Sequence, residues 1–187
     1  MGKALSDMTL EELWELFPIF LTEHKEIWDN WYAEEQKRLA DIFLSENIKI
    51  NHIGSTAING IWAKPIIDIL AEIPAYLPMD KVKQLLIQNG YICMSEQRDR
   101  ISFNRGYTSE GFAEKVFHLH LRYEGDNDEL YFRDYLNDNP LLAKQYEKLK
   151  LSLWKKFEHD RDGYTLAKTS FVAEQTDKAK KYYGHRY

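Results

Sequence analysis

The stretch Pro65-Ile-Ile-Asp-Ile-Leu-Ala-Glu-Ile73 constrains the fold of this chain more than any other segment. It has the pattern of a β-strand that is too apolar to leave one face exposed, so we expect it inside a covered sheet. Asp68 stands within it, and an unpaired buried charge is costly. Asp68 therefore has either a function or a structural ion pair, for which Lys64 and Arg122 are the candidate partners.

Further strands and helices are predicted from hydrophobic spacing and turn residues on both sides of this segment. Alternation predicts strands at 48–53, 91–94, 101–105 and 116–123. Helical spacing predicts helices from 10 to about 44 with a bend or break at Pro18, and at 80–88, 130–136, 139–157 and about 164–183, with a turn at 160–163. Thr9 and Glu12 form a capping-box pattern at the start of the first helix.

These elements predict one α+β domain over residues 1–187, with a small mixed central sheet between two groups of helices. Residues 1–45 form the helical N-terminal part, 46–125 the sheet-containing core and 126–187 the C-terminal helices.

Composition excludes several classes of protein. The chain has 25 basic and 30 acidic residues, and a net charge of −5 argues against general nucleic-acid binding. A single cysteine, Cys93, excludes an internal disulfide and a cysteine-rich zinc site, and it indicates a reducing compartment. No apolar stretch is long enough to span a membrane, and residues 1–4 lack the apolar run of a signal peptide. We expect a soluble cytoplasmic protein with no membrane partner, and the oligomeric state stays open.

Two histidines share one face of the predicted strand 116–123, because side chains alternate along a strand. If the neighbouring strands pair suitably, His52, Asp68, His118 and His120 converge on one polar face. Such a set suits one divalent metal ion or acid–base work at neutral pH. The alternative is that the imidazoles face solvent or hydrogen-bond to neighbouring strands.

A small polar turn follows the first predicted strand. Gly54 lets a ligand approach the backbone closely, and Ser55 and Thr56 supply hydroxyl and amide groups that suit an anion. This pattern predicts a phosphate site. The alternative is an ordinary helix N-cap with Ser55 or Thr56 as the capping residue.

These residues belong to longer motifs, through which the chain resembles the GrpB family over about residues 45–170. The matching segments are His52-Ile-Gly-Ser-Thr-Ala-Ile-Asn-Gly-Ile-Trp-Ala-Lys-Pro-Ile-Ile-Asp-Ile-Leu70, His118-Leu-His-Leu121, Phe132-Arg-Asp-Tyr-Leu136 and Tyr146-Glu-Lys-Leu-Lys150. The resemblance implies a nucleotidyltransferase-like fold of the DNA polymerase β type. In that superfamily a Gly-Ser turn holds triphosphate, and strand carboxylates bind two magnesium ions.

The chain departs from the superfamily pattern at the carboxylates. Asp68 matches the first acid, but Leu70 stands where the second is expected, and the later strand offers histidines. Glu72 lies four residues from Asp68, roughly 13 Å along a strand. Because imidazole suits zinc, manganese or nickel better than magnesium, we predict that any bound metal is a single transition ion. Its ligands would be Asp68, His118, His120 and His52.

Basic residues near these motifs are further phosphate-binding candidates. Lys64 precedes the central strand, Arg122 ends the strand of the histidines, and Arg133 follows in a matched helical segment. The alternatives are a surface lysine for Lys64 and a structural anchor between helix and sheet for Arg133. Tyr164 and Lys168 are expected to lie where they could close over the cleft.

Three hypotheses follow for function. The first is a nucleotidyl- or phosphoryl-transferase acting on a nucleotide or phosphorylated small molecule, with Asp68, His118 and His120 as catalytic residues. The second is a non-catalytic module that binds a nucleotide or another anion, or a coenzyme A-linked accessory protein as the family resemblance implies. The third is an interaction protein that uses the aromatic N-terminal helices.

Overall fold

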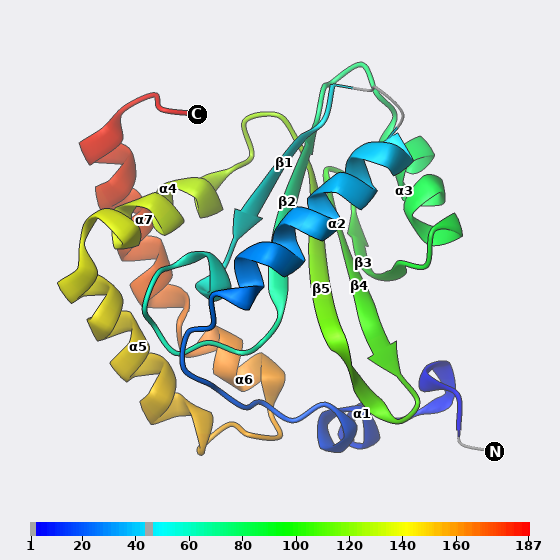
Figure 1. Ribbon diagram of the computed structural model, residues 1–187, viewed down its shortest axis with the longest axis horizontal. Coiled ribbons are helices and arrows are strands. Elements are labelled where there is room, and N and C mark those ends of the chain that lie inside the picture. The colour runs from blue at the N-terminus through cyan, green and yellow to red at the C-terminus, as the bar shows by residue number, and fades with distance from the viewer. Residues whose placement is uncertain (1–2, 44–46) are drawn as a thin grey trace.

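A five-stranded sheet forms the centre of the molecule in a computed structural model that describes residues 3–43 and 47–187 (Figure 1). The strands lie in the order β1-β2-β5-β4-β3, with β2 and β5 parallel and every other pair antiparallel. The mixed α+β architecture predicted from the sequence is therefore confirmed. The strands are β1 (Lys49–Ile53), β2 (Ile67–Ile73), β3 (Ile92–Gln97), β4 (Arg100–Thr108) and β5 (Gly111–Tyr123).

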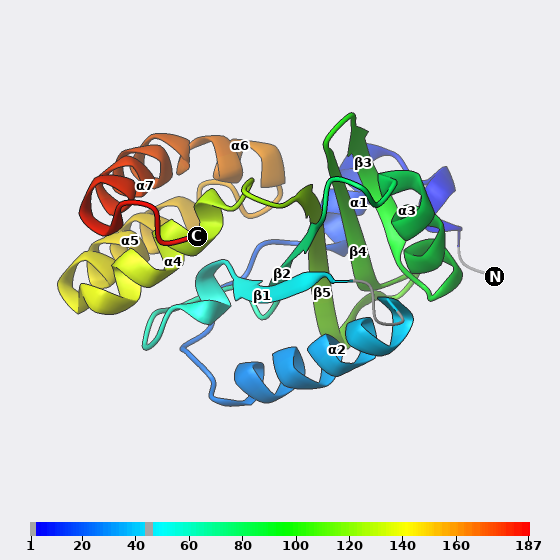
Figure 2. The same cartoon turned by 90° about the horizontal axis from the view of Figure 1, so that it is seen from above.

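One face of the sheet is apolar and covered by two helices. Alternate residues of β2 and β5 put Ile67, Ile69, Phe117 and Leu119 into the largest core cluster, where none is more than 1% exposed. Helices α2 (Ile27–Phe43) and α3 (Met79–Gln88) supply the other side of this core. Figure 2 shows α2 running along this face.

The N-terminal segment forms two separate helices. Helix α1 (Leu10–Leu16) begins with the predicted capping box, in which Thr9 and Glu12 exchange side-chain-to-backbone hydrogen bonds. Pro18 follows shortly after the end of α1, and the chain then runs without a helix until α2 begins at Ile27. The predicted break at Pro18 is confirmed. The predicted helix end at Leu44, the boundary at 45/46 and the start at Met1 and Gly2 lie outside the described residues.

Four helices follow the sheet and pack beside its β1–β2 edge (Figures 1 and 2). They are α4 (Asp128–Asp138), α5 (Pro140–Trp154), α6 (Arg161–Leu166) and α7 (Thr169–Tyr183). The predicted turn at 160–163 is wrong, because the Asp160 side chain accepts a hydrogen bond from the Gly163 amide and so begins α6. The final helix accordingly begins at Thr169 instead of about 164.

The described helices differ from membrane spans in length and hydropathy. None within residues 3–43 and 47–187 is both long enough and apolar enough to cross a bilayer.

Candidate functional site

Asp68 lies beside both strand histidines on the face opposite the apolar core. In the parallel pair β2–β5, Asp68 is in register with His118 and Leu70 with His120. Asp68 Oδ1 is 3.1 Å from His118 Nδ1 and 3.8 Å from His120 Nε2. The structure therefore brings these three residues together, as the alternation of the strands predicts.

The electrostatics of this cluster fix the protonation of His118. Burial raises the pKa of Asp68, but the hydrogen bond with His118 and the nearby imidazole of His120 outweigh burial and hold that pKa well below its usual range. Burial lowers the pKa of His118 to about 4, even though Asp68 opposes the shift. An ionised carboxylate only accepts, so His118 Nδ1 donates to Asp68 and its Nε2 accepts from the Tyr107 hydroxyl 2.8 Å away.

Gly54 makes close approach to Asp68 feasible. Its φ is +71°, and a Cβ built there would lie 2.3 Å from Asp68 Oδ2. Any other residue would be strained by its backbone and would clash with the carboxylate. The Gly54–Ser55 turn therefore lies directly against Asp68, and Ser55 lines the cavity in front of it.

Four basic side chains surround the same cavity. Lys64 precedes β2, Lys150 lies on α5, Arg161 begins α6, and Lys168 lies between α6 and α7. The ammonium groups of Lys64 and Lys168 lie 5.5 and 4.3 Å from the centre of the Tyr164 ring. Aromatic faces attract cations, so the ring holds both lysines toward one region.

Burial governs the charge of these lysines. Loss of water around the ammonium groups lowers the pKa of Lys64 and of Lys150 to about 7, and that of Lys168 to about 8. Neighbouring cations reinforce the shift, as Arg161 and Lys168 do for Lys64. Lys150 is only 1% exposed and donates to the Trp62 carbonyl. Crowded cations of this kind are stabilised by an anion.

The cavity has a volume of about 300 Å³. Basic groups dominate its charge: Asp68 is the one acid in its lining, against three lysines and one arginine. We call it the cationic pocket, and it is lined by Leu21, Gly54, Ser55, Lys64, Ile66, Asp68, His118, His120, Phe132, Tyr146, Lys150, Arg161, Tyr164, Thr165 and Lys168.

His52 does not join this cluster, so its predicted convergence with Asp68 is wrong. The antiparallel register pairs His52 with Ile69 and Ile53 with Asp68, and partners across a ladder share a face. His52 therefore points to the other side of the sheet, where its ring stacks on Tyr32 of α2 at 4.7 Å. Burial lowers the pKa of His52 to about 4.

Thr56 is also directed into the protein. Its hydroxyl lies 3.0 Å from His52 Nε2 and 3.2 Å from the Ile66 carbonyl oxygen, and Thr56 is 1% exposed. These bonds occupy its polar atoms and fix the turn after β1, so Thr56 lies outside the lining of the cationic pocket.

Both arginines predicted to bind phosphate lie elsewhere. Arg122 stands four residues beyond His118 on β5, opposite Glu72, and its Nε is 3.7 Å from Asp126. This end of the sheet is remote from the Gly54 turn, so an Asp68–Arg122 ion pair is excluded. Arg133 of α4 donates to the His52 carbonyl oxygen at 2.8 Å, which is the anchoring role weighed as its alternative.

The magnesium pair implied by the superfamily pattern does not fit these residues. Leu70, at the position of the second acid, is fully buried against Ile53 and Leu130. Within the described ranges, no three histidine, cysteine, aspartate or glutamate side chains are placed to hold a metal ion. Both ring nitrogens of His118 are hydrogen-bonded, and the surrounding lysines repel a cation. The predicted single transition ion is an untested hypothesis that this geometry does not favour.

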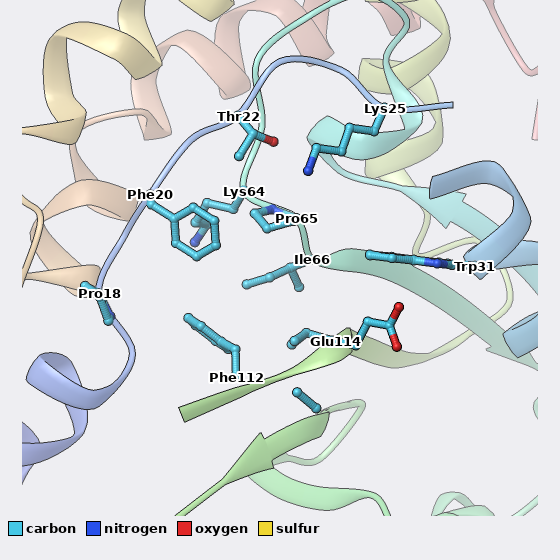
Figure 3. A pocket seen from close by; sticks show the side chains of 12 residues that line it. Pro18, Phe20, Thr22, Lys25, Trp31, Lys64, Pro65, Ile66, Phe112 and Glu114 are labelled. Carbon is cyan, nitrogen blue, oxygen red and sulfur yellow. The ribbon is translucent and has the colours of Figure 1, made fainter. Parts of the chain in front are cut away.

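Two further cavities open beside the cationic pocket. The smaller, about 340 Å³, meets it at Lys64 and Ile66, and Phe20, Trp31 and Phe112 lie around it (Figure 3). The larger, about 930 Å³, lies between α1 and strands β3 and β4 and shares His118, His120, Arg161 and Thr165 with the cationic pocket. We call this larger cavity the apolar groove.

Three residues of the site, Lys150, Arg161 and Tyr107, are not identified by the sequence patterns. Lys150 and Tyr146 end and begin one matched motif, and their i, i+4 spacing places both on one face of α5. That spacing was a readable signal for Lys150. Arg161 carries no such signal, because its local sequence is typical of a turn and only the start of α6 directs it to the cavity.

Comparison with known proteins agrees with the resemblance. A family model described as GrpB protein matches residues 18–178. The glutamate-rich protein GrpB of Alkalihalophilus pseudofirmus is 39% identical over 162 residues, covering 83% of this chain and 92% of that protein. The UPF0157 protein YqkA of Bacillus subtilis is 32% identical, and the chain spans 46% of its length.

Solved structures are similar as well. The crystal structure of the conserved protein GrpB from Enterococcus faecalis is similar with a TM-score of 0.76 and 28% identity, over 88% of this chain and 99% of that one. A chain of the GLD-2/RNP-8 complex gives a TM-score of 0.50 at 12% identity, over 78% and 58%. The similarity to the chain of the GLD-2/RNP-8 complex concerns the fold alone. That fold is nucleotidyltransferase-like. Because the family model matches most of its length, this chain belongs to the GrpB family.

Proposed function

We propose that the cationic pocket binds the phosphate group of a phosphorylated small molecule, such as a nucleotide. The observation that carries the proposal is the excess of basic over acidic groups around a cavity of about 300 Å³. Lysines whose pKa is lowered by burial gain most from an anion, because the anion replaces the lost hydration of each ammonium.

The geometry of the turn supports the same ligand. Gly54 leaves the backbone bare in front of Asp68, and Ser55 adds a hydroxyl donor to the lining. Tyr164 holds Lys64 and Lys168 in place, so less side-chain entropy is lost when they bind a shared anion. A planar guanidinium at Arg161 adds the option of two parallel hydrogen bonds to one phosphate.

Group transfer is the second candidate, and one observation favours it. His118, held by Asp68 through Nδ1, accepts a hydrogen bond from the Tyr107 hydroxyl at Nε2 beside Arg161, so Asp68, His118 and Tyr107 form a connected chain of proton donors and acceptors at the edge of the pocket. The buried Leu70 argues against the two-magnesium form of that chemistry. A non-catalytic nucleotide or anion module and a coenzyme A-linked accessory role both use the same phosphate pocket.

Calorimetric titration with inorganic phosphate tests the binding proposal. We expect wild type to bind phosphate and Lys168→Met to bind it at least about tenfold more weakly, because one of four cations is lost. Lys148→Met is the matched control, since Lys148 is exposed on α5 and lies outside the lining of the pocket. Absence of binding to wild type, or equal losses in both variants, would contradict the proposal.

A further inference from the structure

We propose that the ligand is a phosphate ester with an apolar ring or chain, and that the apolar part occupies the groove between α1 and strands β3 and β4. The inference rests on the proposed phosphate binding and adds the chemistry of the rest of the ligand. It assigns a second subsite to the molecule.

The groove is lined mainly by hydrophobic side chains. Leu10 and Leu13 of α1 stand on one side, and Ile92 and Met94 of β3 on the other. Leu10, Ile92 and Met94 are 52%, 43% and 53% exposed, which is high for large apolar residues. Apolar side chains gathered around one concavity are typical of a surface that is covered in the functional state.

The groove and the cationic pocket are continuous. His118, His120, Arg161 and Thr165 line both, so a ligand with its phosphate among the lysines extends past these residues into the groove. The volume of about 930 Å³ accommodates a ring system or a chain of several carbons. A phosphate ester joins one charged end to one uncharged end, which matches the change in lining from lysine to leucine and methionine.

A buried polar group marks the join between the two cavities. Asn104 is in register with His118 across the β4–β5 pair, lines the groove and is 4% exposed. Its Nδ2 amide has no hydrogen-bond partner among the described residues. An unsatisfied buried donor is costly, so Asn104 points to a ligand that carries an acceptor oxygen here, as a phosphate ester does.

The smaller cavity of Figure 3 fits the apolar part less well. It meets the cationic pocket only at Lys64 and Ile66, so the Lys64 side chain stands at the connection. Its lining also includes the charged groups of Lys25 and Glu114. The larger groove also has two charged residues in its lining, Arg161 and Asp162, but they are neighbours at the start of α6, and the α1 and β3 residues of the lining are uncharged.

Paired titrations separate this inference from the proposed function. The probes are inorganic phosphate, which reports on the cationic pocket, and 1-naphthyl phosphate, which adds an apolar ring. We expect wild type to bind 1-naphthyl phosphate at least about tenfold more tightly than phosphate, because burying the ring removes apolar surface from water.

A groove-filling variant gives the decisive comparison. Ser102 is in register with His120 and lines the groove, so Ser102→Trp fills the space beside the histidine. Wild type should bind 1-naphthyl phosphate more tightly than phosphate, and we expect this difference in affinity to disappear in Ser102→Trp. The affinity of Ser102→Trp for phosphate should equal that of wild type. Ser152→Trp, at an exposed serine of α5 outside the groove, should keep both affinities.

Met94→Asn, at an exposed position, is a second variant that does not depend on accommodating a large side chain. It should lower the affinity for 1-naphthyl phosphate about threefold and leave the affinity for phosphate unchanged. Equal affinity of wild type for the two probes, or a gain that survives both groove variants, would overturn the inference. Failure of wild type to bind either probe would overturn the proposed phosphate binding together with it.

Discussion

The two faces of the central sheet are made by alternate residues of the same strands, yet they differ in what they contribute. On one face Ile69 and Leu119 are fully buried beneath α2 and α3. On the other, Asp68, His118 and His120 line a cavity crowded with basic groups. Apolar burial stabilises the fold, whereas crowded and desolvated cations oppose it. The polar face is therefore maintained at a cost in stability, as binding sites commonly are.

Substitution of neighbours on β5 is the strongest test of this comparison. Leu119→Ala opens a cavity in the main core, so the free energy of unfolding should fall by about 2–5 kcal/mol. His120→Ala, one residue further on, removes a side chain that is 26% exposed from the polar face and should lower the free energy of unfolding by less than about 1 kcal/mol. Urea unfolding of both variants measures the difference. Similar losses of unfolding free energy in the two variants would mean that the polar face is part of the core.

Two glycines with the same backbone angle offer a sharper test of the polar face. Gly54 and Gly60 both have φ of +71°, but a Cβ at Gly54 would meet Asp68 at 2.3 Å, while a Cβ at Gly60 meets nothing within 4 Å. Alanine strains the backbone at both positions by about 1 kcal/mol. We expect Gly54→Ala to cost about 1–3 kcal/mol more in unfolding free energy than Gly60→Ala.

Phosphate titration of the same two variants separates stability from binding. Gly54→Ala should also lose phosphate affinity, because its methyl group displaces the Asp68 carboxylate from the turn. Gly60→Ala should keep wild-type affinity. A Gly54→Ala protein that is as stable as Gly60→Ala and binds phosphate normally would contradict the close approach of Gly54 to Asp68.

The sequence was sufficient to predict which face each residue of β2 and β5 occupies. Strict alternation at 116–123 separated Leu119 from His118 and His120, and the acid inside an apolar run identified Asp68. These signals are local, because the side-chain period of a strand depends only on its own backbone. The same locality explains the confirmed capping box at Thr9.

Properties that depend on register or on distant packing could not be predicted. His52 was expected beside Asp68, but the pairing of Ile53 with Asp68 turns His52 to the other face, and a shift of one residue would have reversed this. Lys150 and Arg161 reach the pocket from helices far along the chain. The i, i+4 spacing of Tyr146 and Lys150 indicates a shared helix face but not what that face contacts, and no spacing marks Arg161, so only the fold shows that both join Lys64 and Lys168 around one cavity.

The smallest expected effect is a pH dependence of anion affinity, and it follows from the lowered pKa values of the buried lysines. Burial places the pKa of Lys64 and of Lys150 at about 7 and that of Lys168 at about 8. The protonated forms attract an anion, so affinity is greatest below pH 7 and is lost as pH rises through 7 and 8. Sulfate is the suitable probe, because its charge of −2 does not change in this range.

We expect sulfate affinity to fall by about tenfold between pH 6 and pH 9, which corresponds to about 1.4 kcal/mol. Arg161 also lines the pocket and should preserve residual binding. His118 contributes nothing to this change, because burial holds its pKa at about 4 and the ring is neutral across the range. Calorimetry at four pH values on wild type and Lys168→Met measures the effect. Sulfate affinity of Lys168→Met should decline less steeply above pH 7.5, because this variant lacks the lysine that titrates last. Sulfate affinity of wild type that does not change with pH would show that the lysines keep their ordinary pKa values. The polar face would then carry no electrostatic strain.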